Sequence, residues 1–236
     1  MSKGKLYLIP TPIAETDNIF EQLPEANSKI IDSLDYFVVE NLRTARRFIS
    51  SLKLSKKIDT LEFCELSEHT ASTEVSAMLE PLLKGVSCGL MSEAGVPAVA
   101  DPGSDLVLAA HKKGIEIIPL VGPSSIIISL MCSGLNGQSF AFHGYLPIKG
   151  AEKKSKIKEL ERAVISKNQT QIFIEAPYRA DKMFDDLVSE LGANIKLSVA
   201  ANLMANTQFI KTKTISEWKK STKPDIKKIP TIFLIG

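Results

Sequence analysis

The sequence has few of the residues that build metal centres and disulfide frameworks. Its 236 residues include only three cysteines and three histidines, which are scattered along the chain. Cys64, Cys88 and Cys132 each lie among apolar residues, so we expect reduced thiols of the core and neither a disulfide framework nor a zinc site. Because the histidines are equally dispersed, we expect no metal cofactor.

No charge of one sign dominates. The 29 Lys and Arg residues and 27 Asp and Glu residues leave a formal net charge of +2. Whole-molecule electrostatics therefore give no case for nucleic-acid binding, and only local basic patches could contact phosphates. Two stretches carry such patches, RTARRFISSLKLSKK and KGAEKKSKIK. Charged helix faces are more often simply solvated, which is the alternative for both.

Long apolar runs are also missing. The most apolar stretch, IEIIPLVGPSSIIISLMCSGL, is interrupted by Pro119, Gly122 and Pro123. Each flank is too short to span a bilayer, and the apolar part of the N-terminal MSKGKLYLIPTP is too short for a signal sequence. We therefore expect a cytoplasmic protein that makes no contact with a membrane.

Common nucleotide-binding and hydrolase motifs are absent. No G-x-G-x-x-G follows a predicted strand, and the chain contains no G-x-x-x-x-G-K-[ST] and no G-x-S-x-G. These absences exclude the usual dinucleotide site, the P-loop and the nucleophile elbow of hydrolases.

What the sequence does contain is a regular alternation of apolar strands and helical segments. In the first half, strand patterns occur in KLYLIPTP, YFVVE, DTLEFCEL, VSCGLM and IEIIPL, with helical spacing between them. This alternation predicts a mostly parallel sheet with helices on both faces. One of the helices, TEVSAMLEPLLKG, would be capped by Ser72 or Thr73. Later strands follow one another quickly, which predicts a mixed second sheet and two α/β domains, residues 1–119 and 120–236.

Four clusters of turn-forming residues stand at the ends of predicted strands: PTPI (10–13), SEAGVPAVADPG (92–103), VGPSS (121–125) and EAPYR (175–179). Strand ends normally carry turn residues, so each cluster alone is ordinary. Because the C-terminal ends of parallel strands share one edge of a sheet, the clusters together could line one crevice.

The polar residues of these clusters allow two interpretations. Asp101 could bind a cation or hydroxyl groups, or it could cap the helix after Gly103. Ser124 and Ser125 could bind a carboxylate, or they could cap the helix that they begin. The combination suits a ligand with a cationic centre, a carboxylate and a base.

Six blocks of the chain resemble, in order, those of the tetrapyrrole-methylase superfamily, and in particular its bacterial small-subunit ribosomal RNA 2′-O-methyltransferases. The blocks are LYLIPTPI, VENLRTARRF, GLMSEAGVPAVADPGSDLV, IPLVGPSSIIISLMCSGL, FAFHGYLP and IFIEAPYR. The likeness covers nearly the whole chain. It implies the tetrapyrrole methylase fold, with two α/β domains, S-adenosylmethionine in the cleft between them, and a homodimer.

The resemblance also implies which residues form the site. The cofactor-binding positions would be Pro10, Pro12, Ser92, Glu93, Ala94, Gly95, Val96, Pro97, Ser124, Ser125, Pro230 and Thr231. A ribose hydroxyl that accepts a methyl group needs a base or a polarising contact. The candidates for that catalytic role are Glu40 with Arg43, Glu93, and Glu175.

The chain departs from the family pattern mainly at positions expected to face the substrate. Asn41 and Leu42 replace Asp and Thr, Tyr178 replaces His, and residues 202–205 replace a Glu-Leu-Thr-Lys stretch. These departures leave the methyl-donor pocket better supported than the RNA substrate. The leading hypothesis is an S-adenosylmethionine-dependent methyltransferase acting on ribosomal RNA 2′-hydroxyls or the small subunit. The alternatives are a methyltransferase for a small molecule such as a tetrapyrrole, and a non-catalytic dimeric binding protein that keeps the fold.

Overall fold

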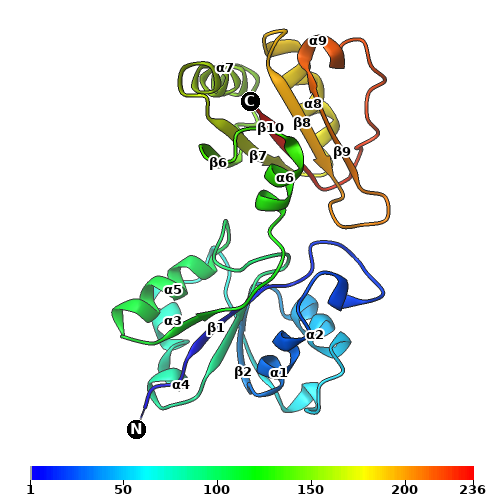
Figure 1. The fold of residues 1–236 in the computed structure, drawn as a ribbon. Helices are drawn as coiled ribbons and strands as arrows, with labels where there is room; N and C mark the ends of the chain where they lie inside the picture. Colours follow the sequence, from blue (N-terminus) through cyan, green and yellow to red (C-terminus); the bar gives the residue numbers. More distant parts are fainter. Residues whose placement is uncertain (1) are drawn as a thin grey trace. The chain divides into compact units, whose positions relative to one another are not determined.

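The structure is a computed structural model that describes residues 2–236. The chain forms two compact units, Met1–Ser124 and Ser125–Gly236. Each unit contains one five-stranded sheet with its own helices (Figure 1).

The sheet of the N-terminal unit has the strand order β3-β2-β4-β1-β5, and all of its strands are parallel. All four residues of the central strand β4 are buried, which agrees with the continuous apolar run expected of a strand covered on both faces. The strands are β1 (Leu6–Ile9), β2 (Tyr36–Val39), β3 (Glu62–Glu65), β4 (Cys88–Met91) and β5 (Ile117–Pro119).

Helices cover both faces of this sheet, as the alternating sequence pattern predicts. One apolar cluster contains Val38 of β2, Leu79 just before α4, and Leu106 of α5, together with a residue of α3. The other cluster contains Phe37 of β2, Phe48 of α2 and an apolar residue of α1. The helical elements are η1 (Ile19–Glu21), α1 (Ala26–Asp32), α2 (Leu42–Ser51), η2 (Ile58–Thr60), α3 (Ser72–Ala77), α4 (Glu80–Leu83) and α5 (Gly103–Lys112).

The segment TEVSAMLEPLLKG differs from the prediction of one capped helix. It forms two helices, α3 and α4, because Pro81 has no N–H group to donate to the carbonyl of Ala77. The predicted cap is also wrong. Ala71 occupies the N-cap position and makes no side-chain capping bond. Ser72 is itself the first helical residue, so its hydroxyl lies one position too far along the helix to act as a cap.

The sheet of the C-terminal unit is mixed, with the order β6-β7-β10-β8-β9. β6 pairs with β7 in parallel, and the other three pairings are antiparallel. The strands are β6 (Phe140–Tyr145), β7 (Thr170–Glu175), β8 (Lys196–Ala201), β9 (Phe209–Thr214) and β10 (Thr231–Ile235); the helices are α6 (Ser125–Ser133), α7 (Gly150–Lys167), α8 (Ala180–Glu190) and α9 (Ile215–Trp218).

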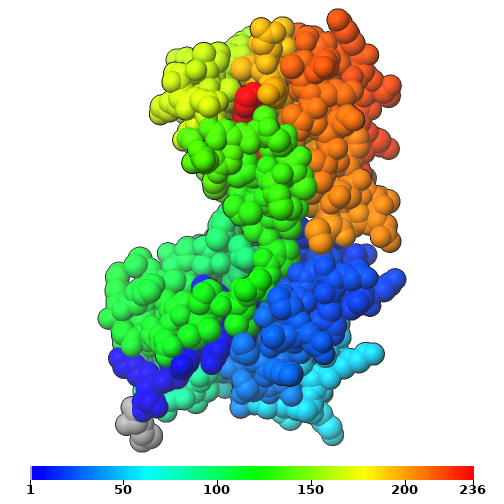
Figure 2. Space-filling view, in the orientation of Figure 1, coloured from blue at the N-terminus to red at the C-terminus, as the bar shows by residue number. Residues whose placement is uncertain are grey.

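The two faces of this second sheet are covered unequally. Phe173 and Phe233 belong to a core shared with α7, α8 and α9. On the other face, α6 is held by a hydrogen bond from Thr212 Oγ1 to the carbonyl of Ser133 (2.8 Å). α6 also forms part of the unit's surface, seen in green in Figure 2. Its side chains Ile127 and Met131 are exposed.

The cysteines are free thiols, but only one is fully buried. Burial raises the pKa of the Cys88 thiol, and Cys64 is half-buried. The prediction of a core thiol is wrong for Cys132, which is exposed. Cys132 lies on α6, a helix with apolar residues on most of its sides. Only one side of α6 packs on the sheet, and Cys132 is not on that side. No helix within residues 2–236 has the length and apolar character needed to cross a bilayer.

Candidate functional site

Three loops meet at the C-terminal edge of the N-terminal sheet. Thr11, after β1, and Gly95, after β4, exchange two backbone hydrogen bonds of 2.9 and 3.1 Å. The loop after β5 rests directly on the first of these loops, because a Cβ atom on Gly122 would lie 2.3 Å from Cβ and Cγ of Pro10. Three of the four predicted turn clusters therefore lie together. The fourth, which begins at Glu175, belongs to the C-terminal sheet.

Within this group of loops, some residues form the interior and others face outward. Pro10, Gly95 and Pro97 are buried, and Gly95 has φ +81°, a conformation that glycine adopts without strain. A Cβ atom there would lie 3.3 Å from the carbonyl oxygen of Pro123. Glu93 and Ala94 are exposed. We call this arrangement the three-loop floor: buried residues set its shape, and exposed ones are accessible to a ligand.

Glu40 joins a fourth loop to the floor. It directly follows β2, and its backbone N–H donates to the carbonyl of Met91 (3.1 Å). Its Oε2 atom accepts a hydrogen bond from the backbone N–H of Glu93 (2.9 Å). The two residues are 53 positions apart in the chain, and no local sequence pattern indicates this contact.

Asp101 holds the end of the same loop in an unusual conformation. Both carboxylate oxygens accept from the N–H of Ala98 (2.9 Å each), and Oδ1 also accepts from Gly103 N–H (2.7 Å). Ala98 and Ala100 have φ +63° and +60°, the left-handed region that alanine disfavours. Burial raises the pKa of Asp101, and the charge of Glu40 adds to this shift. The predicted contact with the start of the following helix is present, but the two left-handed alanines were not predicted.

Asp101→Asn is expected to lower the free energy of unfolding by about 1–3 kcal/mol. An asparagine side chain has one acceptor oxygen. With that oxygen where Oδ1 now lies, both donors keep an acceptor, but the amide nitrogen then faces the N–H of Ala98 at the position of Oδ2. Urea unfolding of the purified variant measures the loss. Asp105→Asn is the matched control, because it removes the same charge from the first turn of α5 and should cost only about 0.3–1 kcal/mol. Equal losses in the two variants would contradict the role assigned to Asp101.

Beside these residues the N-terminal unit has a depression of about 670 Å³. It is lined by Glu40, Asn41, Ser67, Glu68, Glu93, Ala98, Ala100, Asp101, Pro102, Ser104 and Asp105. Five of these side chains are carboxylic acids, so the depression favours ligands that donate hydrogen bonds and disfavours anions. Across the part of the chain that the structure describes, no group of three or more His, Cys, Asp or Glu side chains is arranged to hold a metal ion.

Arg43 lies close to the depression in sequence but is not paired with Glu40. It is exposed in the first turn of α2, and none of the ion pairs found in residues 2–236 joins it to Glu40. Asn41 caps α2, because its Oδ1 accepts from the N–H groups of Arg43 (3.0 Å) and Thr44 (3.1 Å). Asn and Asp are equally good caps, so the replacement of Asp by Asn41 keeps this local role.

In the C-terminal unit, Glu175 is fixed by its neighbours. Its Oε1 accepts from Nε (2.8 Å) and Nη2 (2.6 Å) of Arg179 and from the N–H of Ala176 (2.7 Å). The hydrogen bond from Arg179 raises the pKa of that guanidinium. Because this carboxylate is buried and paired with Arg179, it is less accessible to a substrate hydroxyl than Glu40 is, so we favour a positioning role for it.

The remaining predicted cofactor residues lie at the start of β10 and at the start of α6. Thr231, the first residue of β10, is opposite Glu175 of β7. Its hydroxyl donates to the carbonyl of Ile229 (2.9 Å), whereas the preceding Pro230 is exposed. Ser125 is the first residue of α6 and is half-buried. Ser124 is the last residue of the N-terminal unit.

Solved structures with similar architecture show which fold the chain adopts. The methyltransferase CobJ matches with a TM-score of 0.63 and 17% identity, over 99% of this chain and 94% of that chain. Cobalt precorrin-4 methyltransferase matches with a TM-score of 0.58 and 14% identity, over 98% and 94%. A uroporphyrin-III-C-methyltransferase from Thermus thermophilus matches with 0.55 and 17%, over 99% and 92%. The fold is thus the two-domain α/β fold of the tetrapyrrole methylases, as predicted.

Sequence relatives define the family within that class. No family model matches the chain. Ribosomal RNA small subunit methyltransferase I of Vibrio cholerae is 30% identical over 212 residues, which are 90% of this chain and 69% of that protein. The protein of the same name from Halalkalibacterium halodurans is 31% identical over 221 residues, 93% and 68%. The chain belongs to the ribosomal RNA small subunit methyltransferase I family, and the predicted resemblance is confirmed.

Proposed function

We propose that the protein is an S-adenosylmethionine-dependent methyltransferase that modifies a ribose 2′-hydroxyl of small-subunit ribosomal RNA. Membership of the family makes it a methyltransferase, and the relatives are named for small-subunit ribosomal RNA. The observation that carries the proposal is the acidic depression lined by Glu40, directly beside the three-loop floor. The solved structures of tetrapyrrole enzymes share only 14–17% identity with the chain, so they give no support to a macrocyclic substrate.

The residues of the three-loop floor fit the methyl donor that the fold family implies. Gly95 and the exposed Ala94 leave the backbone accessible to a ligand, and the exposed carboxylate of Glu93 favours a cationic centre such as a sulfonium. When bound, S-adenosylmethionine supplies an electrophilic methyl group. The positions in the C-terminal unit, namely Ser125, Pro230 and Thr231, remain predictions from the resemblance, as does Ser124.

Glu40 is the best candidate for the base. Its Oε2 is oriented by the N–H of Glu93, and Oε1 has no hydrogen-bond partner among the residues that the structure covers. The carboxylate takes the proton of the ribose hydroxyl while the hydroxyl oxygen forms the new bond to carbon and the carbon–sulfur bond breaks. Holding the hydroxyl in line with the methyl group supplies much of the rate enhancement, about 7–11 kcal/mol in the most favourable cases.

We also propose that the protein works in the cytoplasm as a homodimer, because its substrate is ribosomal and the resemblance implies a dimer. Size-exclusion chromatography with light scattering tests the dimer directly. A single chain mass at micromolar concentration would contradict it.

The function is tested by methyl transfer to purified small ribosomal subunits. We expect label from S-adenosylmethionine to appear in RNA and to be recovered in an alkali-resistant dinucleotide, since a 2′-O-methyl group blocks attack on the adjacent phosphodiester. Label in alkali-sensitive mononucleotides would place the methyl group on a base and contradict ribose methylation. Label in added uroporphyrin, with none in RNA, would favour the small-molecule alternative. Label in neither substrate would favour the non-catalytic alternative.

A further inference from the structure

The proposed chemistry leaves without a role a set of cationic side chains on the segment that follows Glu40 in the chain. α2 and the loop that follows it carry six such residues. Two of them are neutralised, because Arg46 pairs with Asp59 (2.6 Å) and Lys56 with Asp35 (2.5 Å). The other four are exposed and belong to no ion pair found among residues 2–236. We call these four the α2 strip: Arg43, Arg47, Lys53 and Lys57.

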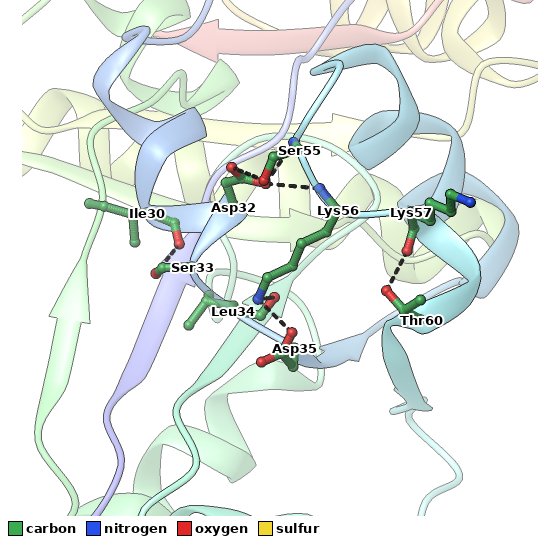
Figure 3. A network of polar contacts seen from close by, with 9 residues as sticks. All are labelled: Ile30, Asp32, Ser33, Leu34, Asp35, Ser55, Lys56, Lys57 and Thr60. Atoms are coloured by element: carbon green, nitrogen blue, oxygen red, sulfur yellow. Dashed lines mark hydrogen bonds and ion pairs between the residues drawn. The ribbon is translucent and has the colours of Figure 1, made fainter.

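The loop that carries the end of the strip is held in one conformation. Asp32, at the end of α1, accepts from the N–H (2.9 Å) and the hydroxyl (2.7 Å) of Ser55. The hydrogen bond from the hydroxyl of Ser55 lowers the pKa of Asp32. Lys56 Nζ donates to the carbonyl of Leu34 (3.3 Å). Figure 3 shows these contacts and the side chain of Lys57 pointing away from them. An ordered loop loses less conformational entropy when it binds a ligand.

The second basic stretch of the sequence, on α7, does not offer the same free charge. Four lysines of this stretch pair with carboxylates of α7 or α8. The pairs are Lys153–Asp186, Lys154–Glu190, Lys156–Glu159 and Lys158–Glu161. Of the two stretches that the sequence singled out, only the one on α2 therefore keeps several unneutralised cations.

The strip begins where the acidic depression ends. Glu40 and Asn41 line the depression, and α2 starts at the next residue. Arg43 and Arg47 are one helical turn apart and so lie on the same side of α2. A polyanion is repelled by the carboxylates of the depression and attracted by the strip. A neutral nucleoside, with hydroxyl and amino donors, is favoured in the depression itself.

We propose that the α2 strip binds the sugar-phosphate backbone of the RNA beside the nucleotide that enters the acidic depression. The proposal rests on the proposed function and adds to it the surface that docks the substrate. The strip holds the phosphates, and this contact delivers the ribose hydroxyl to Glu40. A target nucleotide displaced from its stack would have its phosphates on the α2 strip and its sugar and base in the acidic depression.

The test compares two triple variants with the same change of charge. The strip variant is Arg47→Gln/Lys53→Asn/Lys57→Gln; it leaves Arg43 intact, and asparagine suits the left-handed backbone of Lys53 (φ +52°). The control is Lys84→Gln/Lys112→Gln/Lys167→Gln, three exposed lysines outside the strip. Binding of a 20-nucleotide single-stranded RNA is measured over a range of salt concentrations, and methyl transfer is measured with small ribosomal subunits.

We expect the strip variant to bind the RNA on the order of 10- to 100-fold more weakly at 150 mM salt. Its slope of log K against log salt should fall by about 2, because each phosphate contact on a single strand contributes about 0.7. The KM for subunits should rise with little change in kcat, and the control should match the wild type. An unchanged salt slope and KM in the strip variant would overturn the proposal.

Failure of the docking surface and failure of the proposed function give different results. If the wild type methylates subunit RNA but the strip variant behaves as the control does, the function stands and the docking surface is wrong. If the wild type methylates no RNA, the proposed function fails, and the RNA salt slopes alone decide whether the strip binds phosphates. A wild type that binds no RNA overturns the strip proposal whatever the methylation assay shows.

Discussion

Glu40→Gln is expected to lower kcat for methyl transfer to small subunits by about 10²–10⁴-fold. The amide cannot accept the proton of the ribose hydroxyl. Its carbonyl oxygen can still accept the hydrogen bond from Glu93 N–H that Glu40 Oε2 now accepts at 2.9 Å. The loops should therefore keep their positions, and calorimetric titration should show unchanged affinity for S-adenosylmethionine. The measurement separates loss of the base from loss of the site.

Glu25→Gln provides the control for this experiment. Glu25 is exposed before α1 and makes no side-chain capping bond, so its replacement removes the same charge without touching the depression. Wild-type turnover in Glu40→Gln would show that the base is another group. Glu93, the remaining exposed carboxylate of the predicted set, would then be the next residue to replace.

Gly122→Ala should both destabilise the N-terminal unit and weaken binding of the methyl donor. The added Cβ would lie 2.3 Å from Cβ and Cγ of Pro10 and 3.1 Å from Leu23 Cδ2. A proline ring cannot rotate away, so the loops after β1 and β5 must separate. Overpacking of this kind costs about 1–3 kcal/mol. Urea unfolding followed by far-ultraviolet circular dichroism measures the loss, and titration with S-adenosylmethionine measures the change in the site.

Two internal comparisons sharpen the Gly122 experiment. Gly137→Ala is a matched glycine substitution with no heavy atom within 4 Å of the new Cβ, so it should leave unfolding and binding unchanged. Trp218, the single tryptophan, is buried in the C-terminal unit, and its fluorescence reports that unit alone. If Gly122→Ala binds S-adenosylmethionine as tightly as the wild type does, the three-loop floor is not the donor site.

The strands and helices were largely predictable because their determinants are local. The apolar runs of KLYLIPTP and VSCGLM became the central parallel strands β1 and β4, and the rapid succession of later strands became the mixed sheet. The prediction failed where a local pattern is ambiguous. In TEVSAMLEPLLKG the apolar spacing indicates one helix, but a single missing N–H at Pro81 divides it. In SIIISLMCS the composition indicates burial, but only tertiary packing decides which side of the helix faces the sheet.

The candidate site was predictable as a set of loops and much less so as a set of contacts. The positions of turn residues at strand ends indicated where the loops begin, and parallel pairing brought three of them together. The hydrogen bond between Glu40 and Glu93 N–H depends on how two distant loops pack, so no local signal reveals it. The left-handed Ala98 and Ala100 run against the preference of alanine, and they persist because Asp101 accepts hydrogen bonds from the N–H groups of Ala98 and Gly103. Such conformations follow from tertiary contacts, and residue preferences do not predict them.

The position of β10 determines when the C-terminal sheet can form during synthesis. β10 comes last in sequence among the strands of residues 2–236 but lies between β7 and β8 in the sheet. Until residues 231–235 are made, β6–β7 and β8–β9 are two separate pairs, each with an unpaired apolar edge. The N-terminal sheet, in contrast, has all of its strands by residue 119. A ribosome that stalls before residue 231 would therefore hold a chain with one complete sheet and one divided sheet, whose unpaired apolar edges are prone to aggregate.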